Sequence, residues 1–95
     1  MSGRDVATAR LSISGHVHGV GYRAAFANEA QMLDLTGWVR NRVDGTVEAV
    51  VSGDVQAVAR IVAWARRGPR GAAVSAVESE PFAGEFERFD ILPTT

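Results

Sequence analysis

A short run of residues near the amino-terminal end combines the groups needed to bind an anion. From Gly15 to Arg23 the chain reads Gly-His-Val-His-Gly-Val-Gly-Tyr-Arg. Because glycine accepts positive φ and has no side chain, such a loop can turn several backbone N–H groups toward one ligand. The helical pattern that follows would add free N–H groups and the positive end of its dipole, which makes phosphate the natural guest. Arg23 can supply a planar guanidinium to the same anion.

Arg23 and Asn41 each have a structural interpretation beside the functional one. An arginine at a helix start can be a plain surface residue, but its charge opposes the helix dipole there, so we favour anion binding for Arg23. Asn41, which the predicted strands aim at the loop, can be a polar strand-end residue bonded to neighbouring backbone. The strand pattern alone leaves both interpretations of Asn41 open.

The composition describes one domain and lacks the marks of several other classes. The formal net charge of −1 argues against general nucleic-acid binding, which needs a basic excess. No stretch approaches the roughly 20 apolar residues needed to cross a bilayer, and the first residues lack the apolar centre of a signal peptide. We therefore expect a cytoplasmic protein without membrane contact. The chain has no cysteine, and its two histidines, two positions apart, make a poor metal site, so we expect no metal.

The elements that must position this chemistry alternate between strands and helices. Residues 1–8 carry no periodic pattern and are expected to be flexible, while residues 9–92 are expected to form the single domain. Apolar periodicity and turn residues predict a strand at 10–15, a helix at 22–34, strands at 36–43 and 46–52, a helix from the N-cap Asp54 to the basic turn 66–71, and strands at 72–80 and 86–92.

The connection between the second and third predicted strands decides which side chains face the core. A two-residue turn would place Arg40 and Arg42 on the face of the valines and bury their charges. A three-residue loop that ends in a left-handed Gly45 instead places Asn41 with the valines and Arg40 on the opposite face, near Glu48. We therefore predict the three-residue loop.

Packing of the later elements is less well determined. Phe89 and Ile91 are expected to point inward, and Tyr22 is expected to anchor the first helix in the core. The register of the fourth strand stays open, because Val74 and Val77 fall on opposite faces unless a bulge intervenes. The buried stripe of the second helix is expected to comprise Val55, Val58, Ile61, Val62 and Ala65.

The order β-α-β-β-α-β, with a short fifth strand, predicts an α+β fold of the ferredoxin-like type, with an antiparallel sheet and both helices on one face. This fold also hosts RNA-binding and regulatory modules. An RNA-binding sheet would expose aromatic residues among basic ones, whereas the exposed face of the first strand offers Arg10, Ser12 and Ser14. A regulatory module would keep the anion site without turnover, and only an assay separates it from an enzyme. No large apolar patch is predicted, so we expect a monomer.

Two motifs in this order resemble the acylphosphatase family. The first family motif is Gly-x-Val-Gln-Gly-Val-x-(Phe/Tyr)-Arg, which the run from Gly15 to Arg23 matches except at His18, where the family usually has glutamine. The second is Gly-aromatic-Val-(Lys/Arg)-Asn-x-x-x-Gly-x-Val, which the run from Gly37 to Val47 matches. A lone glycine-rich loop would be weak evidence, but the pair at this separation is strong.

The resemblance implies a small hydrolase that cleaves acyl phosphates to a carboxylate and inorganic phosphate without a cofactor. It assigns phosphate binding to Arg23 and positioning of the attacking water to Asn41. It also implies that a loop of seven residues holds the phosphate through backbone N–H groups: His16, Val17, His18, Gly19, Val20, Gly21 and Tyr22. Because that loop acts mostly through its backbone, we expect activity to survive the histidine at position 18. The side chain of His18 either braces the loop by a hydrogen bond or contacts the ligand.

The implied reaction needs few groups. A carboxylate leaving group has a conjugate acid with a pKa of about 4, so no strong general acid is required. Phosphoryl transfer depends mainly on positioning and charge stabilisation, which N–H donors and one guanidinium can supply. Asn41 is too weak a base to deprotonate water, but its amide can hold a water in line. A similar domain occurs within larger carbamoyl-transfer proteins, and the length of this chain favours the free enzyme.

Overall fold

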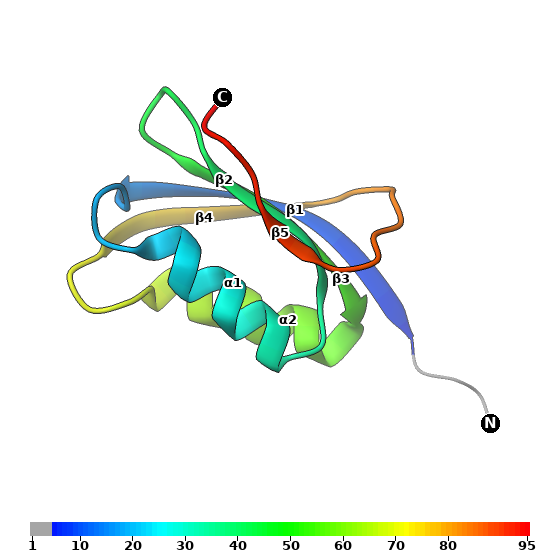
Figure 1. The fold of residues 1–95 in the computed structure, drawn as a ribbon. Coiled ribbons are helices and arrows are strands. Elements are labelled where there is room, and N and C mark those ends of the chain that lie inside the picture. Colours follow the sequence, from blue (N-terminus) through cyan, green and yellow to red (C-terminus); the bar gives the residue numbers. More distant parts are fainter. Residues whose placement is uncertain (1–4) are drawn as a thin grey trace.

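The computed structural model describes residues 5–95, which form a five-stranded sheet covered on one face by two helices (Figure 1). The elements are β1 (Val6–His16), α1 (Tyr22–Met32), β2 (Thr36–Asn41), β3 (Val47–Asp54), α2 (Val55–Arg67), β4 (Ala73–Pro81) and β5 (Phe89–Ile91). The strand order is β4-β1-β3-β2-β5. The predicted ferredoxin-like α+β fold is confirmed, with both helices on the same face, but the sheet is mixed and not wholly antiparallel, because β5 pairs in parallel with β2.

Several predicted element bounds need correction. The first strand begins at Val6 rather than at residue 10, because residues 6–8 continue the antiparallel ladder with residues 52–54 of β3. Main-chain pairing needs no apolar alternation, so the sequence pattern did not reveal it. Residues 1–4 of the segment expected to be flexible lie outside the described residues. Helix α1 ends at Met32, two residues early, and the left-handed Asp34 (φ 58°) lies beyond it.

The hairpin between β2 and β3 has the predicted three-residue loop. Asn41 pairs with Val47 and Arg40 pairs with Glu48, and the Arg42 N–H donates to the Thr46 carbonyl oxygen at 2.9 Å to close the loop. Gly45 is left-handed, with φ of 95°. The pairing puts Asn41 on the helix-covered face, as the argument from buried charge predicted.

A bulge sets the register of β4, which the sequence left open. Ser14 pairs with Ala76 and Gly15 with Val74, so one residue of β4 is unpaired between them. Both Val74 and Val77 thereby pack against the core. Gly15 is required at this point, because an added Cβ would lie 2.2 Å from the Ala73 carbonyl oxygen.

The core beneath the helices is built around aromatic side chains. Tyr22 and Phe26 of α1 pack against Trp64 of α2, with ring centroids 5.6 and 5.8 Å from the Trp64 ring, and Phe26 also meets Phe89 of β5 at 5.9 Å. Tyr22 is buried and its hydroxyl donates to the Ala65 carbonyl oxygen at 2.8 Å. Tyr22 therefore anchors the start of α1 in the core, as predicted.

Two residues predicted to be buried are exposed. Ile91 is 50% exposed, because β5 is the outermost strand and pairs, in parallel, with β2 alone. Val55 is 44% exposed at the first position of α2, whose buried stripe begins one turn later at Val58.

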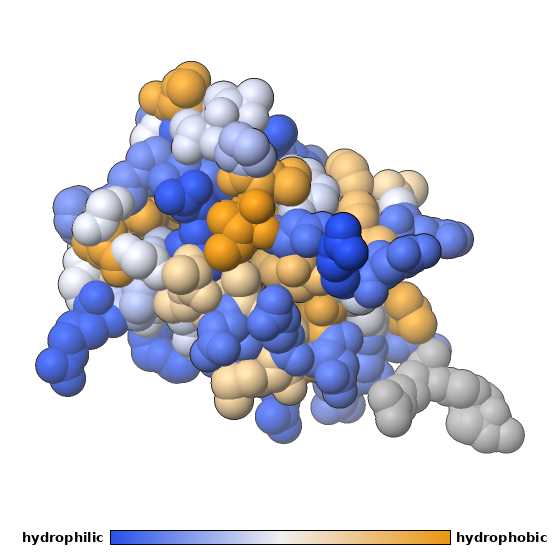
Figure 2. Space-filling view, in the orientation of Figure 1, coloured by the Kyte–Doolittle hydropathy of each residue, from blue (hydrophilic) through white to orange (hydrophobic). Residues whose placement is uncertain are grey.

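On the surface that Figure 2 presents, apolar groups lie among hydrophilic ones. The expectation of a monomer stays a prediction. Neither helix of the described part is long and apolar enough to cross a membrane.

Candidate functional site

The loop between β1 and α1 is built for backbone contacts. Gly19 and Gly21 are both left-handed, with φ of 74° and 75°, and nothing lies within 4 Å of a Cβ added at either position. Glycine is therefore needed at these two positions for its conformation and not for space. Gly21 is the N-cap of α1, and it contributes no side-chain hydrogen bond to the first turn.

The two helix starts differ in how their N–H groups are satisfied. In α2 the Asp54 carboxylate accepts from the Gln56 N–H at 3.2 Å. The first turn of α1 has no side-chain cap and no acidic residue. The first N–H groups of a helix have no intrahelical partner, so those of α1 are free to bind an anion.

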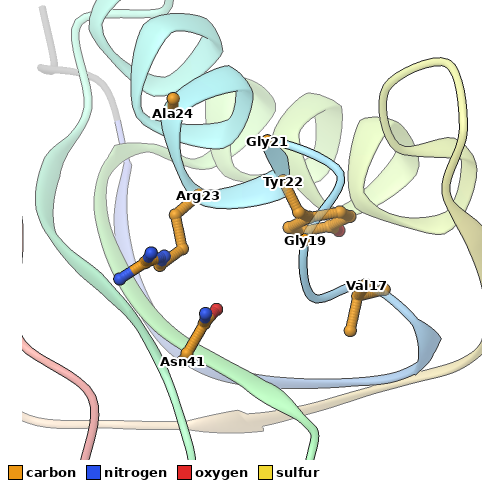
Figure 3. A pocket seen from close by; sticks show the side chains of 7 residues that line it. All are labelled: Val17, Gly19, Gly21, Tyr22, Arg23, Ala24 and Asn41. Carbon is orange, nitrogen blue, oxygen red and sulfur yellow. The ribbon is translucent and has the colours of Figure 1, made fainter.

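A pocket of about 150 Å³ opens beside this helix start. Figure 3 shows the side chains of Arg23 and Asn41 extending into the same space from α1 and from the end of β2, with the loop on the other side. The structure thus brings together two parts that are separated in the sequence, the stretch 17–24 and Asn41. The lining residues are Val17, Gly19, Gly21, Tyr22, Arg23, Ala24 and Asn41.

Three residues of the predicted loop do not line the pocket. His16 is exposed at the end of β1, and Val20 is partly buried against the core. His18 is turned toward the β2–β3 hairpin, where its Nε2 lies 2.9 Å from the Thr46 carbonyl oxygen. The phosphate-binding role of the whole loop stays a prediction. Ala24 lines the pocket although the motif did not include it; its place one residue after Arg23, in the first turn, was the available signal.

Arg23 is half-buried and has no ion pair among residues 5–95. The other arginines that form no ion pair within this range are all exposed, on α2 and in the turn after it: Arg60, Arg66, Arg67 and Arg70. A half-buried guanidinium without a carboxylate partner retains its full charge for a ligand. Arg23 therefore provides positive charge beside the free N–H groups at the start of α1.

Asn41 has an unusual hydrogen-bonding state. Its Oδ1 atom is buried, and it has no hydrogen-bond partner among the residues that the structure describes. Leaving a buried acceptor unpaired costs about 1–3 kcal/mol, so native structures rarely do so. The main chain of Asn41 is held on both sides, by the ladder with Val47 and by the Thr95 N–H, which donates to the Asn41 carbonyl oxygen at 3.2 Å. The amide is thus held in a fixed place with unused hydrogen-bonding capacity.

The phenol of Tyr22 is not available for proton transfer. Burial raises the pKa of the Tyr22 hydroxyl well above its ordinary value, and its proton is donated to Ala65. The pocket lining contains no carboxylate and no histidine. Whatever chemistry occurs in it must proceed without a general base from the lining side chains. Within residues 5–95 no group of three or more His, Cys, Asp or Glu side chains could hold a metal ion.

The opposite face of the sheet carries a cluster that the sequence predicted only in part. Glu48 is 4% exposed, and its Oε2 accepts from Arg10 Nε at 2.5 Å. Its Oε1 lies 2.8 Å from Arg40 Nη2 and 3.3 Å from Arg42 Nη1. Burial alone would raise the pKa of Glu48, but hydrogen bonds from Arg40 and Arg10 outweigh burial and hold that pKa below its ordinary value. The arginines of this face are therefore engaged within the protein.

The chain matches known proteins over most of its length. A family model for acylphosphatase matches residues 9–91. An acylphosphatase of Albidiferax ferrireducens is 50% identical over 88 residues, which cover 93% of this chain and 96% of that protein. An acylphosphatase of Cupriavidus necator is 51% identical over 87 residues, covering 92% and 95%. The solved structure of an acylphosphatase from Coxiella burnetii is 32% identical, with a TM-score of 0.90 over 93% of this chain and 94% of that one.

Proposed function

The chain belongs to the acylphosphatase family and is an enzyme that hydrolyses acyl phosphates, and we propose that the pocket at the start of α1 is its active site. In this proposal Arg23 and backbone N–H groups of residues 16–22 bind the phosphate, and Asn41 positions the water that attacks it. We propose that the active unit is a monomer.

One observation carries this proposal. Among residues 5–95, the pocket joins a helix start without a side-chain cap, a half-buried arginine without an ion pair and a buried amide oxygen without a hydrogen-bond partner. The unpaired amide oxygen is costly in the free protein, and a hydrated anion in the pocket would supply partners to all three groups. A folded core of this size would normally pair such groups internally, as it does around Glu48.

Phosphate binding would be mainly electrostatic. The Arg23 guanidinium can donate two parallel hydrogen bonds to phosphate oxygens, and the N–H groups near Gly19 and Gly21 can surround the remaining ones. Negative charge shifts onto the phosphoryl oxygens and the leaving group during transfer. Donors that are already in place stabilise that charge without reorganisation, which is the main source of rate enhancement in such a site.

Asn41 would act by position and not as a base. Its amide holds a water molecule in line with the bond between phosphorus and the acyl oxygen. The water oxygen bonds to phosphorus while the bond between phosphorus and the acyl oxygen breaks. The electron pair of the broken bond leaves with the carboxylate. One proton of the water passes to a phosphoryl oxygen of the substrate, giving dihydrogen phosphate. Since the leaving carboxylate is weakly basic, with a conjugate-acid pKa of about 4, it needs no proton from the enzyme.

Hydrolysis of benzoyl phosphate, followed by its ultraviolet absorbance with and without EDTA, tests the proposal. We expect turnover by the wild-type protein that EDTA leaves unchanged and that inorganic phosphate inhibits competitively. The Asn41→Ala variant should retain phosphate inhibition while losing most of its turnover. Equal turnover by wild-type protein and Asn41→Ala would contradict the assignment of the water site.

A further inference from the structure

The proposed phosphate loop, residues 16–22, and the β2–β3 hairpin lie at the same end of the sheet (Figure 1). One side chain joins them: His18 Nε2 lies 2.9 Å from the Thr46 carbonyl oxygen. Since a carbonyl oxygen can only accept, Nε2 must carry the hydrogen and donate it. Building on the proposed function, we propose that His18 is a positioning residue, which sets the distance between the phosphate loop and Asn41 through this hydrogen bond.

The carbonyl that receives the bond is itself part of the Asn41 hairpin. The Thr46 carbonyl oxygen also accepts from the Arg42 N–H at 2.9 Å, immediately after Asn41 in the chain. The Asp44 carboxylate holds Thr46 from the other side, accepting from its N–H at 2.9 Å and from its hydroxyl at 2.7 Å. Thr46 is therefore a fixed point, and a group bonded to it is placed relative to Asn41.

The loop needs such an attachment because its glycines do not restrict it. A Cβ added at Gly19 or Gly21 would meet no atom within 4 Å, so both positions open to free space. Glycine also has the widest choice of backbone angles of any residue. The buried Val17 fixes the start of the loop and the buried Tyr22 fixes its end. His18 attaches the segment between them to the hairpin.

The same contact bears on the other interpretation of His18, direct contact with the ligand. His18 does not line the pocket, and its Nε2 proton is already used by Thr46. A histidine that bound phosphate through Nε2 would have to give up this bond. The geometry therefore favours the bracing role over the ligand role.

A measurement on the wild-type protein tests the hydrogen bond without any variant. At alkaline pH, where histidine is neutral, the nitrogen shifts in a long-range ¹H–¹⁵N correlation spectrum report which ring nitrogen carries the proton. We expect His18 to be the Nε2–H tautomer. The chain has two histidines, so the two ring-nitrogen signals that are absent from the spectrum of His18→Gln belong to His18. An Nδ1–H tautomer for His18 would overturn the proposal.

The positioning role itself is tested by kinetics of His18→Ala and His18→Gln. We expect His18→Ala to lower kcat about fivefold and to raise KM and the phosphate inhibition constant by a smaller factor, since one neutral hydrogen bond is lost. His18→Gln should restore most of kcat, because the glutamine amide can donate to the same carbonyl oxygen. Wild-type kcat in His18→Ala, or no recovery in His18→Gln, would contradict the proposal.

A matched control lies at the other end of the same hairpin. Thr36 Oγ1 donates to the Ser52 carbonyl oxygen, also from a side chain to the backbone between neighbouring strands. Thr36→Val should leave kcat and KM unchanged, which separates positioning from a general loss of stability. If wild-type protein hydrolyses benzoyl phosphate and only the His18 results fail, the positioning role is wrong and the proposed function stands. Absence of wild-type turnover would refute the proposed function, and the tautomer would still report on the hydrogen bond.

Discussion

Two polar regions lie back to back at the end of β2, and they differ in how completely their groups are paired. On the open face, Arg40 and Arg42 contact the buried Glu48 carboxylate. On the helix-covered face lies Asn41, between these two arginines in the chain. In the part of the chain that the structure describes, its Oδ1 has no hydrogen-bond partner and the neighbouring Arg23 has no ion pair. Strand alternation alone separates the two regions.

The difference shows how to distinguish a structural polar group from a functional one. A buried charge remains in a fold when it is paired, and pairing of this kind leaves little attraction for a ligand. A buried group that remains unpaired in the free protein does not stabilise it, and such a group indicates a place where a ligand or water binds. We therefore expect substitutions in the pocket to affect activity and substitutions around Glu48 to affect stability.

The largest effect is expected from Arg23→Met. We expect kcat/KM for benzoyl phosphate to fall by about a thousandfold, because two charge-assisted hydrogen bonds of roughly 2 kcal/mol each are lost. Stability should change little, since Arg23 has no ion pair within residues 5–95. Steady-state kinetics and urea unfolding measure the two quantities. Arg60→Met, at an exposed arginine of α2, is the control and should leave both unchanged. A large loss of stability in Arg23→Met would erase the contrast between the two faces.

Asn41→Ala should act on turnover rather than on binding. We expect kcat to fall about a hundredfold, the usual effect of removing one positioned hydrogen-bonding group from an active site. The inhibition constant of phosphate should stay within about threefold of wild type, because the loop and Arg23 remain. The free energy of unfolding should not decrease by more than about 1 kcal/mol, since the amide oxygen that is removed has no hydrogen-bond partner among the described residues. Weak phosphate binding with normal kcat would exchange the roles assigned to Asn41 and Arg23.

Glu48→Gln should show the reverse pattern. We expect it to destabilise the protein by about 2 kcal/mol, because it removes the buried charge that Arg10, Arg40 and Arg42 share and leaves Arg40 without a carboxylate partner among residues 5–95, while keeping one acceptor oxygen. Turnover per folded molecule should remain close to wild type. Glu80→Gln is the matched control: Glu80 pairs with the same Arg10 but is exposed, so its loss should cost less than about 0.5 kcal/mol. Equal destabilisation by the two variants would mean that burial of Glu48 contributes nothing.

The smallest expected effect is a pH dependence of stability. The pKa of Glu48 is lowered on folding, so its contribution is fully present above its ordinary pKa of 4.5 and is lost as the pH falls through the lower, folded-state value. Wild-type protein should therefore lose stability more steeply than Glu48→Gln below about pH 5. Urea unfolding at several acidic pH values gives the slope of the unfolding free energy against pH for both proteins. Parallel slopes would show that Glu48 does not titrate differently in the folded and unfolded states.

The hairpin shows how far reasoning from the sequence could go. Because Arg40 and Arg42 are charged and must avoid the core, only the three-residue loop was acceptable between the two strands. That choice correctly placed Asn41 toward the core and Arg40 beside Glu48. The prediction succeeded because both strands and their turn are contiguous in the chain. For β4, whose partner strand is about sixty residues away, the same reasoning could not choose a register, and the bulge opposite Gly15 resolved it.

The sequence by itself determined the order of the elements, the glycine loop before a helix, the Asp54 cap and the alternation around Asn41. These follow from backbone preferences and periodicities that act over a few residues. The sequence also carried the family motifs that singled out Arg23 and Asn41.

Only the tertiary structure decided which of these groups meet. It brought Arg10 to Glu48 across the sheet and turned His18 toward Thr46. In one pocket it left the Arg23 guanidinium without an ion pair and Asn41 Oδ1 without a hydrogen-bond partner among residues 5–95. These outcomes depend on the strand order and on packing between segments distant in the chain, where local preference has no influence. Whether a polar residue is paired or free is a property of its neighbours in space, and that property distinguishes the Glu48 cluster from the pocket.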